Sequence, residues 1–131
     1  MSTRNGQTET LDRVPPHNLD AERAVLGSVL LYPDCLDDVL DVVREPAEFH
    51  GFDHQVIFRE LLALHHAGQA IDVTLLAERL TTSGMLDSIG GLDYLAEVVN
   101  AVPTAANAQH YAGIVREKAR LRALIAAALE T

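Results

Sequence analysis

The stretch from Asp72 to Ile125 decides the fold, and it reads DVTLLAERL TTSGMLDSIG GLDYLAEVVN AVPTAANAQH YAGIVREKAR LRALI. Asp72 can cap a helix, Gly84 can close it, and Gly90-Gly91 permits a tight turn into the next one. The last helix of the stretch, from roughly Thr104 onward, is amphipathic and longer than the others. Nothing in the stretch has a catalytic pattern.

Three more helices are predicted upstream, where apolar residues recur three and four positions apart. The first begins after Asn18, a good N-cap, and ends before Pro33. The second runs from about Pro33 to Val43, and the third begins at Asp53 as its N-cap and ends at Gly68. No segment alternates with period two long enough for a strand. We therefore expect an all-α fold, with a compact orthogonal helical head of about five helices followed by one long helix.

The chain divides into three parts on this interpretation. Residues 1–16 have low hydrophobicity and no periodicity, and Pro15-Pro16 opposes a helix start, so they are predicted to form a disordered N-terminal arm. Residues 17–102 form the globular head, and residues 103–131 form the long helix. The chain ends without a glycine cap or a helix breaker, which is typical of a boundary inside or just after a helix.

Length and composition predict one domain in a reducing compartment. The 131 residues are 48% hydrophobic, which is ample for a packed core. Cys35 is the single cysteine and cannot form an internal disulfide. No apolar run approaches the roughly 20 residues of a membrane helix, and no secretory signal is present. We expect a soluble, cytoplasmic protein that does not enter a membrane.

The formal net charge of -9 argues against direct nucleic-acid binding by this chain, because such binding depends on Lys and Arg displacing counterions from phosphates. The charge is uneven. Basic residues gather on the last helix, at Arg116, Lys118, Arg120 and Arg122, and acidic residues gather at Asp34, Asp37, Asp38, Asp41, Glu45 and Glu48. Such runs are typical of solvated faces, and the alternative is a docking surface for another protein.

The last helix is apolar on more than one side. Residues with a seven-residue repeat are Ile114, Leu121 and Ala128, and then Tyr111, Lys118 and Ile125, with Val115 and Leu129 widening the stripe. Two interpretations stay open. The helix could lie across the head as a core helix, or it could project from the head and pair with a second helix.

No catalytic, cofactor-binding or metal site is predicted. Lys118 is the only lysine and lies in no phosphate-binding loop, and Gly90-Gly91 is a turn. His50 and His54 are four apart and His65-His66 adjoin, but no cysteine pair supports zinc, and the acidic residues lack calcium-loop spacing. His65 and His66 more readily complement the negative end of their helix.

The order and spacing of these segments resemble one family. Asn18-Leu19-Asp20-Ala21-Glu22-Arg23-Ala24-Val25-Leu26-Gly27, His54-Gln55-Val56-Ile57-Phe58, Gly90-Gly91 and Pro103-Thr104-Ala105-Ala106-Asn107 are similar to the N-terminal domain of bacterial replicative DNA helicases of the DnaB type. The resemblance covers nearly everything from Pro15 to Ile125.

The resemblance implies a longer parent protein, in which a motor domain binds ATP and magnesium and unwinds DNA as a hexameric ring. The N-terminal domains of this family form a collar, pair through a helical hairpin and receive the C-terminal domain of primase. Residues from Thr104 to Leu129 match the first arm of that hairpin, and the second arm is not present. The chain itself would therefore be no enzyme and hold no cofactor.

Residue roles also follow from the resemblance. The subunit interface would use large side chains of the long helix, namely Tyr111, Ile114, Val115, Leu121, Ile125 and Leu129. Primase-facing candidates are Asp20, Tyr94 and Ile125. Each has an ordinary structural alternative, since Asp20 favours a helix start, Tyr94 suits a core ring with its hydroxyl at the surface, and Ile125 could pack on its own chain.

The sequence offers two alternative functions. One is a freestanding all-α adaptor whose last helix docks in a partner groove, without any helicase attached. The other is a helix-turn-helix DNA reader built on the turn from Gly84 to Gly91, which the lack of a basic face on either neighbouring helix opposes.

Overall fold

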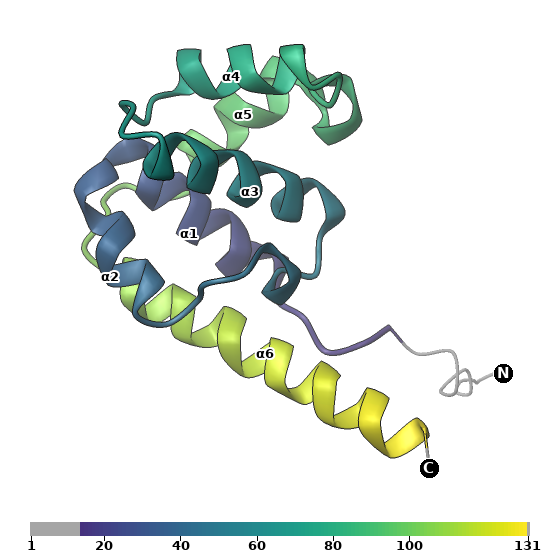
Figure 1. The fold of residues 1–131 in the computed structure, drawn as a ribbon. Coiled ribbons are helices and arrows are strands. Elements are labelled where there is room, and N and C mark those ends of the chain that lie inside the picture. Colours follow the sequence, from purple (N-terminus) through teal and green to yellow (C-terminus); the bar gives the residue numbers. More distant parts are fainter. Residues whose placement is uncertain (1–13, 131) are drawn as a thin grey trace, which may run out of the picture.

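The structure is a computed structural model that describes residues 14–130, so most of the predicted disordered arm and Thr131 lie outside the described residues. Figure 1 shows an all-helical chain. The helices are α1 (Leu19–Leu31), α2 (Leu36–Leu40), α3 (Phe52–His66), α4 (Val73–Thr82), α5 (Gly91–Val99) and α6 (Ala108–Leu129), with 3-10 turns at Pro33–Cys35, Pro46–Glu48 and Asp87–Ile89. Residues 14–130 contain no strand, and the all-α prediction is confirmed.

Several predicted helix ends are confirmed by their hydrogen bonds. The Asn18 side chain accepts from the N–H of Ala21 at 2.9 Å, and Asp72 accepts from the N–H of Leu75 at 2.7 Å. Each bond satisfies a donor that the first helical turn leaves without a partner. Gly84 follows α4 with a φ of 75°, a left-handed conformation that glycine adopts without strain.

Two helix starts differ from the prediction. Helix α3 begins at Phe52 with Gly51 as its N-cap, so Asp53 lies inside the first turn, where its carboxylate favours the helix dipole instead of capping the end. Helix α6 begins at Ala108, four residues after the predicted start, because the residues after Pro103 form a turn in which the Thr104 hydroxyl accepts from the N–H of Ala106.

The second predicted helix is shorter than expected. Residues 33–35 form a 3-10 turn, and α2 ends at Leu40. Helical hydrogen bonding persists in a turn as far as Val43, whose N–H donates to Val39 at 2.8 Å. Repulsion among the exposed carboxylates Asp37, Asp38 and Asp41 opposes a longer regular helix here. Val39 and Val43 are nevertheless buried in the core.

Helix α1 is the centre of the core. It packs against α3, α5 and the first half of α6 (Figure 1). Its apolar side chains meet those of the surrounding helices, and the side chains with no exposed surface are Val25, Leu26, Val29, Val39, Val43, Phe49, Ile57, Phe58, Leu61, Leu64, Leu76, Leu80, Leu95, Val98 and Ala112. Leu92, in the first turn of α5, is 60% exposed.

Gly27 sets how closely α1 and α5 approach. A Cβ atom at this position would lie 2.3 Å from the backbone oxygen of Val98, a distance at which one helix must move. Gly27 is therefore required for close packing, although glycine lowers the intrinsic stability of a helix interior.

Helix α6 packs on the head along its first half and projects from it along its second half. Its first half packs on α1, and its inward residues Ala108, Ala112 and Val115 are buried. Its second half continues past the head to the end of the described chain, as the yellow ribbon in Figure 1 shows. From Leu121 onward every residue except Arg122 is exposed.

Candidate functional site

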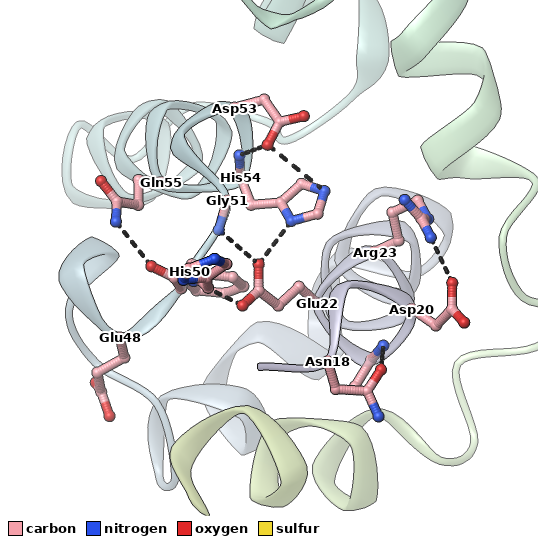
Figure 2. Close-up of polar contacts among 12 residues, drawn as sticks. Asn18, Asp20, Glu22, Arg23, Glu48, His50, Gly51, Asp53, His54 and Gln55 are labelled. Carbon is pink, nitrogen blue, oxygen red and sulfur yellow. Dashed lines mark hydrogen bonds and ion pairs between the residues drawn. The ribbon is translucent and has the colours of Figure 1, made fainter. Parts of the chain in front are cut away.

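Three helices meet at a buried polar group that sequence reasoning missed. The Glu22 carboxylate of α1 accepts from the backbone N–H groups of His50 at 2.6 Å and Gly51 at 3.1 Å, and it bonds His54 Nδ1 of α3 at 2.7 Å (Figure 2). The other ring nitrogen of His54, Nε2, lies 2.5 Å from the Tyr94 hydroxyl of α5. Glu22 and His54 are each 1% exposed.

The chemistry of Glu22 orients this chain of hydrogen bonds. An ionised carboxylate only accepts hydrogen bonds, so His54 Nδ1 must donate to it. The other ring nitrogen, Nε2, faces the Tyr94 hydroxyl. Glu22 thus fixes the orientation of the imidazole ring that holds Tyr94.

Burial alone would raise the pKa of Glu22. The hydrogen bonds from His54 and from the N–H groups of His50 and Gly51, with the charge of His54, outweigh burial and hold this pKa below its ordinary value. The pKa of Tyr94 is raised, mainly by burial, although Arg23 acts in the opposite direction. Both groups therefore keep their ordinary charge states near neutral pH.

Asp20 and Tyr94, two of the predicted primase-facing residues, share a neighbour. Arg23 forms an ion pair with Asp20, and the pKa of Arg23 is raised by a hydrogen bond with Tyr94 and by Asp20. Asp20 is exposed and Tyr94 is half-buried. The structure thus brings these two together in one corner, and Ile125 belongs to the second half of α6.

Four side chains form the exposed apolar stripe of α6. Leu121 is 36% exposed, Leu124 66%, Ile125 46% and Leu129 82%. Sequence reasoning missed Leu124, although its spacing of three from Leu121 placed it on the same helical side. Tyr111 and Ile114 of the predicted interface are half-buried and pack partly against the core.

Val115 has to be removed from the predicted subunit interface. Its side chain is 1% exposed and belongs to the core between α6 and the head. The heptad pattern could not separate it from the outward residues, because α6 is apolar on two sides and only the position of the head shows which side is covered.

Arg122 ties the start of the described chain to α6. Its guanidinium donates to the carbonyl of Pro16 at 2.9 Å and to that of Glu48 at 2.7 Å. The rings of His17 and His50 stack beside it with centroids 4.3 Å apart. Burial, followed by the positive charges of His17 and Arg122, lowers the pKa of His50.

The described residues offer no group of three or more His, Cys, Asp or Glu side chains arranged to hold a metal ion. No helix within residues 14–130 is long and apolar enough to cross a membrane. Two surfaces stand out among the described residues, the corner around Tyr94 and the exposed stripe of α6.

Comparison with known proteins identifies the same fold and sequence pattern. Residues 14–117 match the family described as DnaB-like helicase N terminal domain. The replicative DNA helicase DnaC of Bacillus subtilis is 41% identical over 114 residues, which are 87% of this chain and 25% of that protein. The chain thus spans about a quarter of the length of this relative.

Two solved structures are similar. The N-terminal domain of DnaB helicase from Mycobacterium tuberculosis has a TM-score of 0.86 and 43% identity, covering 89% of this chain and 81% of that one. A DnaB-like replicative helicase, solved with a description of its interactions with primase, has a TM-score of 0.76 and 29% identity, covering 86% of this chain and 26% of that one. The chain belongs to the family of DnaB-like helicase N-terminal domains.

Proposed function

We propose that this domain pairs helicase subunits into a ring and docks the C-terminal domain of primase. The rest of the helicase would be a motor domain that binds ATP and magnesium and unwinds DNA as a hexamer in the cytoplasm. Similarity to replicative DNA helicases supports this proposal, and the chain spans only about a quarter of the length of the Bacillus subtilis relative. The domain itself acts by contacts and not by catalysis.

The exposed stripe of α6 carries the pairing proposal. Leu121, Leu124, Ile125 and Leu129 lie on a helical segment that extends beyond the head, where the described chain offers no second helix to cover them. Fully burying a large apolar side chain contributes about 1.5–3 kcal/mol. A second helix, from another subunit or from a longer version of this chain, is the surface that would bury the stripe.

Primase docking is proposed at the corner of Asp20 and Tyr94, with Ile125 as a separate contact. The similar helicase whose interactions with primase have been described supports a primase partner. Asp20 is exposed in the first turn of α1, and the hydroxyl of Tyr94 is held by His54. A fixed ring and a charge at one corner give a partner defined contacts at little entropic cost.

The motor domain, and not this domain, would bind DNA directly. The formal net charge of -9 opposes phosphate binding by this domain.

Light scattering across a size-exclusion peak tests the pairing. We expect a dimer or larger assembly whose mass rises when the primase C-terminal domain is added. Leu124→Gln with Ile125→Gln should shift the assembly toward monomer, whereas Leu92→Gln, which changes an exposed leucine of the head, should not. Monomers at every concentration, both for this chain and for a version extended past Thr131, would contradict the proposal.

Matched charge variants test primase docking. Asp20→Asn and Asp87→Asn each remove one exposed negative charge from the first turn of a helical segment. We expect only Asp20→Asn to weaken primase binding, together with Tyr94→Ala. Equal binding by all three variants and the unaltered chain would place the primase contact elsewhere.

A further inference from the structure

A cavity of about 660 Å³ opens at the C-terminal end of α1. Its wall is built by Leu31 and Tyr32, by Asp34, Cys35 and Asp38 of the following segment, and by the loop 103–106 that leads into α6. This volume falls within the range of sites that hold small ligands or peptide side chains. The cavity wall lies at the C-terminal end of α1, whereas Asp20 lies in the first turn of that helix. The projecting half of α6 runs away from this end of α1 (Figure 1).

Part of the cavity wall is exposed apolar surface. Tyr32 is 57% exposed and Leu31 is 45% exposed, although both adjoin the packed core of α1. Cys35 lies deeper and is 7% exposed. An open aromatic ring beside an aliphatic side chain can cover the apolar stem of a long side chain and stack on a planar cation.

The cavity wall also carries two negative charges. Asp34 and Asp38 are exposed, and neither forms an ion pair with any of residues 14–130. Carboxylates four residues apart on a helical segment repel each other. Their field reaches into the cavity, because Asp38 and Asp34 add to the effect of burial in raising the pKa of the Cys35 thiol.

The helix dipoles that end near the cavity do not change the negative sign of its electrostatic potential. The C-terminal end of α1 has no basic residue in its last turn and contributes a partial negative charge of about 0.5. The N-terminal end of α6, two residues after Ala106, contributes about the opposite partial charge. These contributions offset each other, and the full charges of Asp34 and Asp38 decide the sign of the potential.

We propose that this cavity binds an arginine side chain of a partner protein, flanked by an apolar residue. The guanidinium would stack on Tyr32 and bond Asp34 and Asp38, and the flanking residue would cover Leu31. Arginine suits the cavity better than lysine, because its planar group stacks on an aromatic ring and offers several donors in one plane. The partner is recognised by charge complementarity, since the cavity wall carries apolar surface and two negative charges that no cation within residues 14–130 pairs.

Backbone amide NMR of the ¹⁵N-labelled chain tests the proposal, with acetyl-Leu-Arg-amide as the probe. We expect shifts confined to residues 31–38 and 103–106, with a dissociation constant of about 1 mM. Acetyl-Leu-Gln-amide, which lacks the charge, should cause none. Asp34→Asn with Asp38→Asn should weaken the arginine probe at least about fivefold, and Tyr32→Ala should weaken it as well.

The control is Asp37→Asn with Asp41→Asn, which removes the same charge from the same segment at two exposed positions outside the cavity. This variant should bind the arginine probe as the unaltered chain does. Equal shifts with the glutamine probe, shifts spread over the acidic surface, equal weakening by both double variants, or no shifts at all would overturn the proposal.

Discussion

The Glu22 carboxylate and the His54 imidazole, each 1% exposed, share a 2.7 Å hydrogen bond between α1 and α3. Glu22 receives two further hydrogen bonds from the backbone at His50 and Gly51. The Glu22 carboxylate therefore joins α1 to α3 and to the backbone at His50 and Gly51. Replacing Glu22 leaves several buried donors without an acceptor.

Glu22→Gln should lower the free energy of unfolding by about 3 kcal/mol, because breaking one side of a buried charged pair leaves its partners unsatisfied. Urea unfolding at neutral pH measures this loss. Glu97→Gln, at an exposed position of α5, is the control and should stay within about 0.5 kcal/mol of the unaltered chain. Equal stability of the two variants would show that the Glu22 network contributes nothing.

The effect of Glu22 should also depend on pH. Its folded pKa lies below the ordinary value of 4.5, so the unfolded chain takes up this proton first as the pH falls. The stability that Glu22 contributes is complete above about pH 4.5 and is lost as the pH falls toward the folded pKa. The stability difference between the unaltered chain and Glu22→Gln should therefore stay constant from about pH 6 to about pH 4.5 and shrink at lower pH, and a difference that stays constant below about pH 4.5 would contradict this account.

Gly27→Ala should destabilise the domain by about 1–3 kcal/mol, because its Cβ would lie 2.3 Å from the backbone oxygen of Val98. Gly113→Ala is a matched control on α6, where nothing lies within 4 Å of the added Cβ. That variant should gain about 0.5–1 kcal/mol from helix propensity. The melting temperature should thus fall for Gly27→Ala and rise for Gly113→Ala. A rise for both variants would rule out a steric role for Gly27.

Arg122→Gln should loosen the start of the described chain, since its guanidinium holds the carbonyls of Pro16 and Glu48. Charged hydrogen bonds of this kind contribute about 1.5–3 kcal/mol each at most. Hydrogen exchange should accelerate at residues 17–22 and 48–51. Arg120→Gln, an exposed arginine on the same helix, should leave these amides unchanged, and equal acceleration in both variants would point to loss of charge alone.

Local features of the fold could be predicted from sequence because they depend on neighbouring residues. Asn18 and Asp72 cap helices by bonding N–H groups three residues away. The helix starts predicted at Asp53 and near Thr104 were wrong. In both places several residues within one turn could begin the helix. Gly51 and Asp53 both suit a helix start, and the backbone around them decides between the two.

The site was harder to predict because distant residues build it. Glu22 and His54 are 32 positions apart, and His54 and Tyr94 are 40 apart. In sequence, Glu22 appeared as an ordinary first-turn carboxylate. Likewise, nothing local distinguished Val115 from the outward residues of α6, since only the packed position of the head shows that this side chain is covered.

The continuity of α6 also affects how a partner would meet its exposed half. Starting a helix is unfavourable, whereas extending one adds a hydrogen bond for each residue fixed. The half of α6 that packs on α1 is a helix nucleus that tertiary contacts already stabilise. The projecting turns therefore only have to extend an existing helix. A partner would then find a preorganised helix and would not have to order a flexible segment. This should favour fast association and reduce the entropy lost on binding.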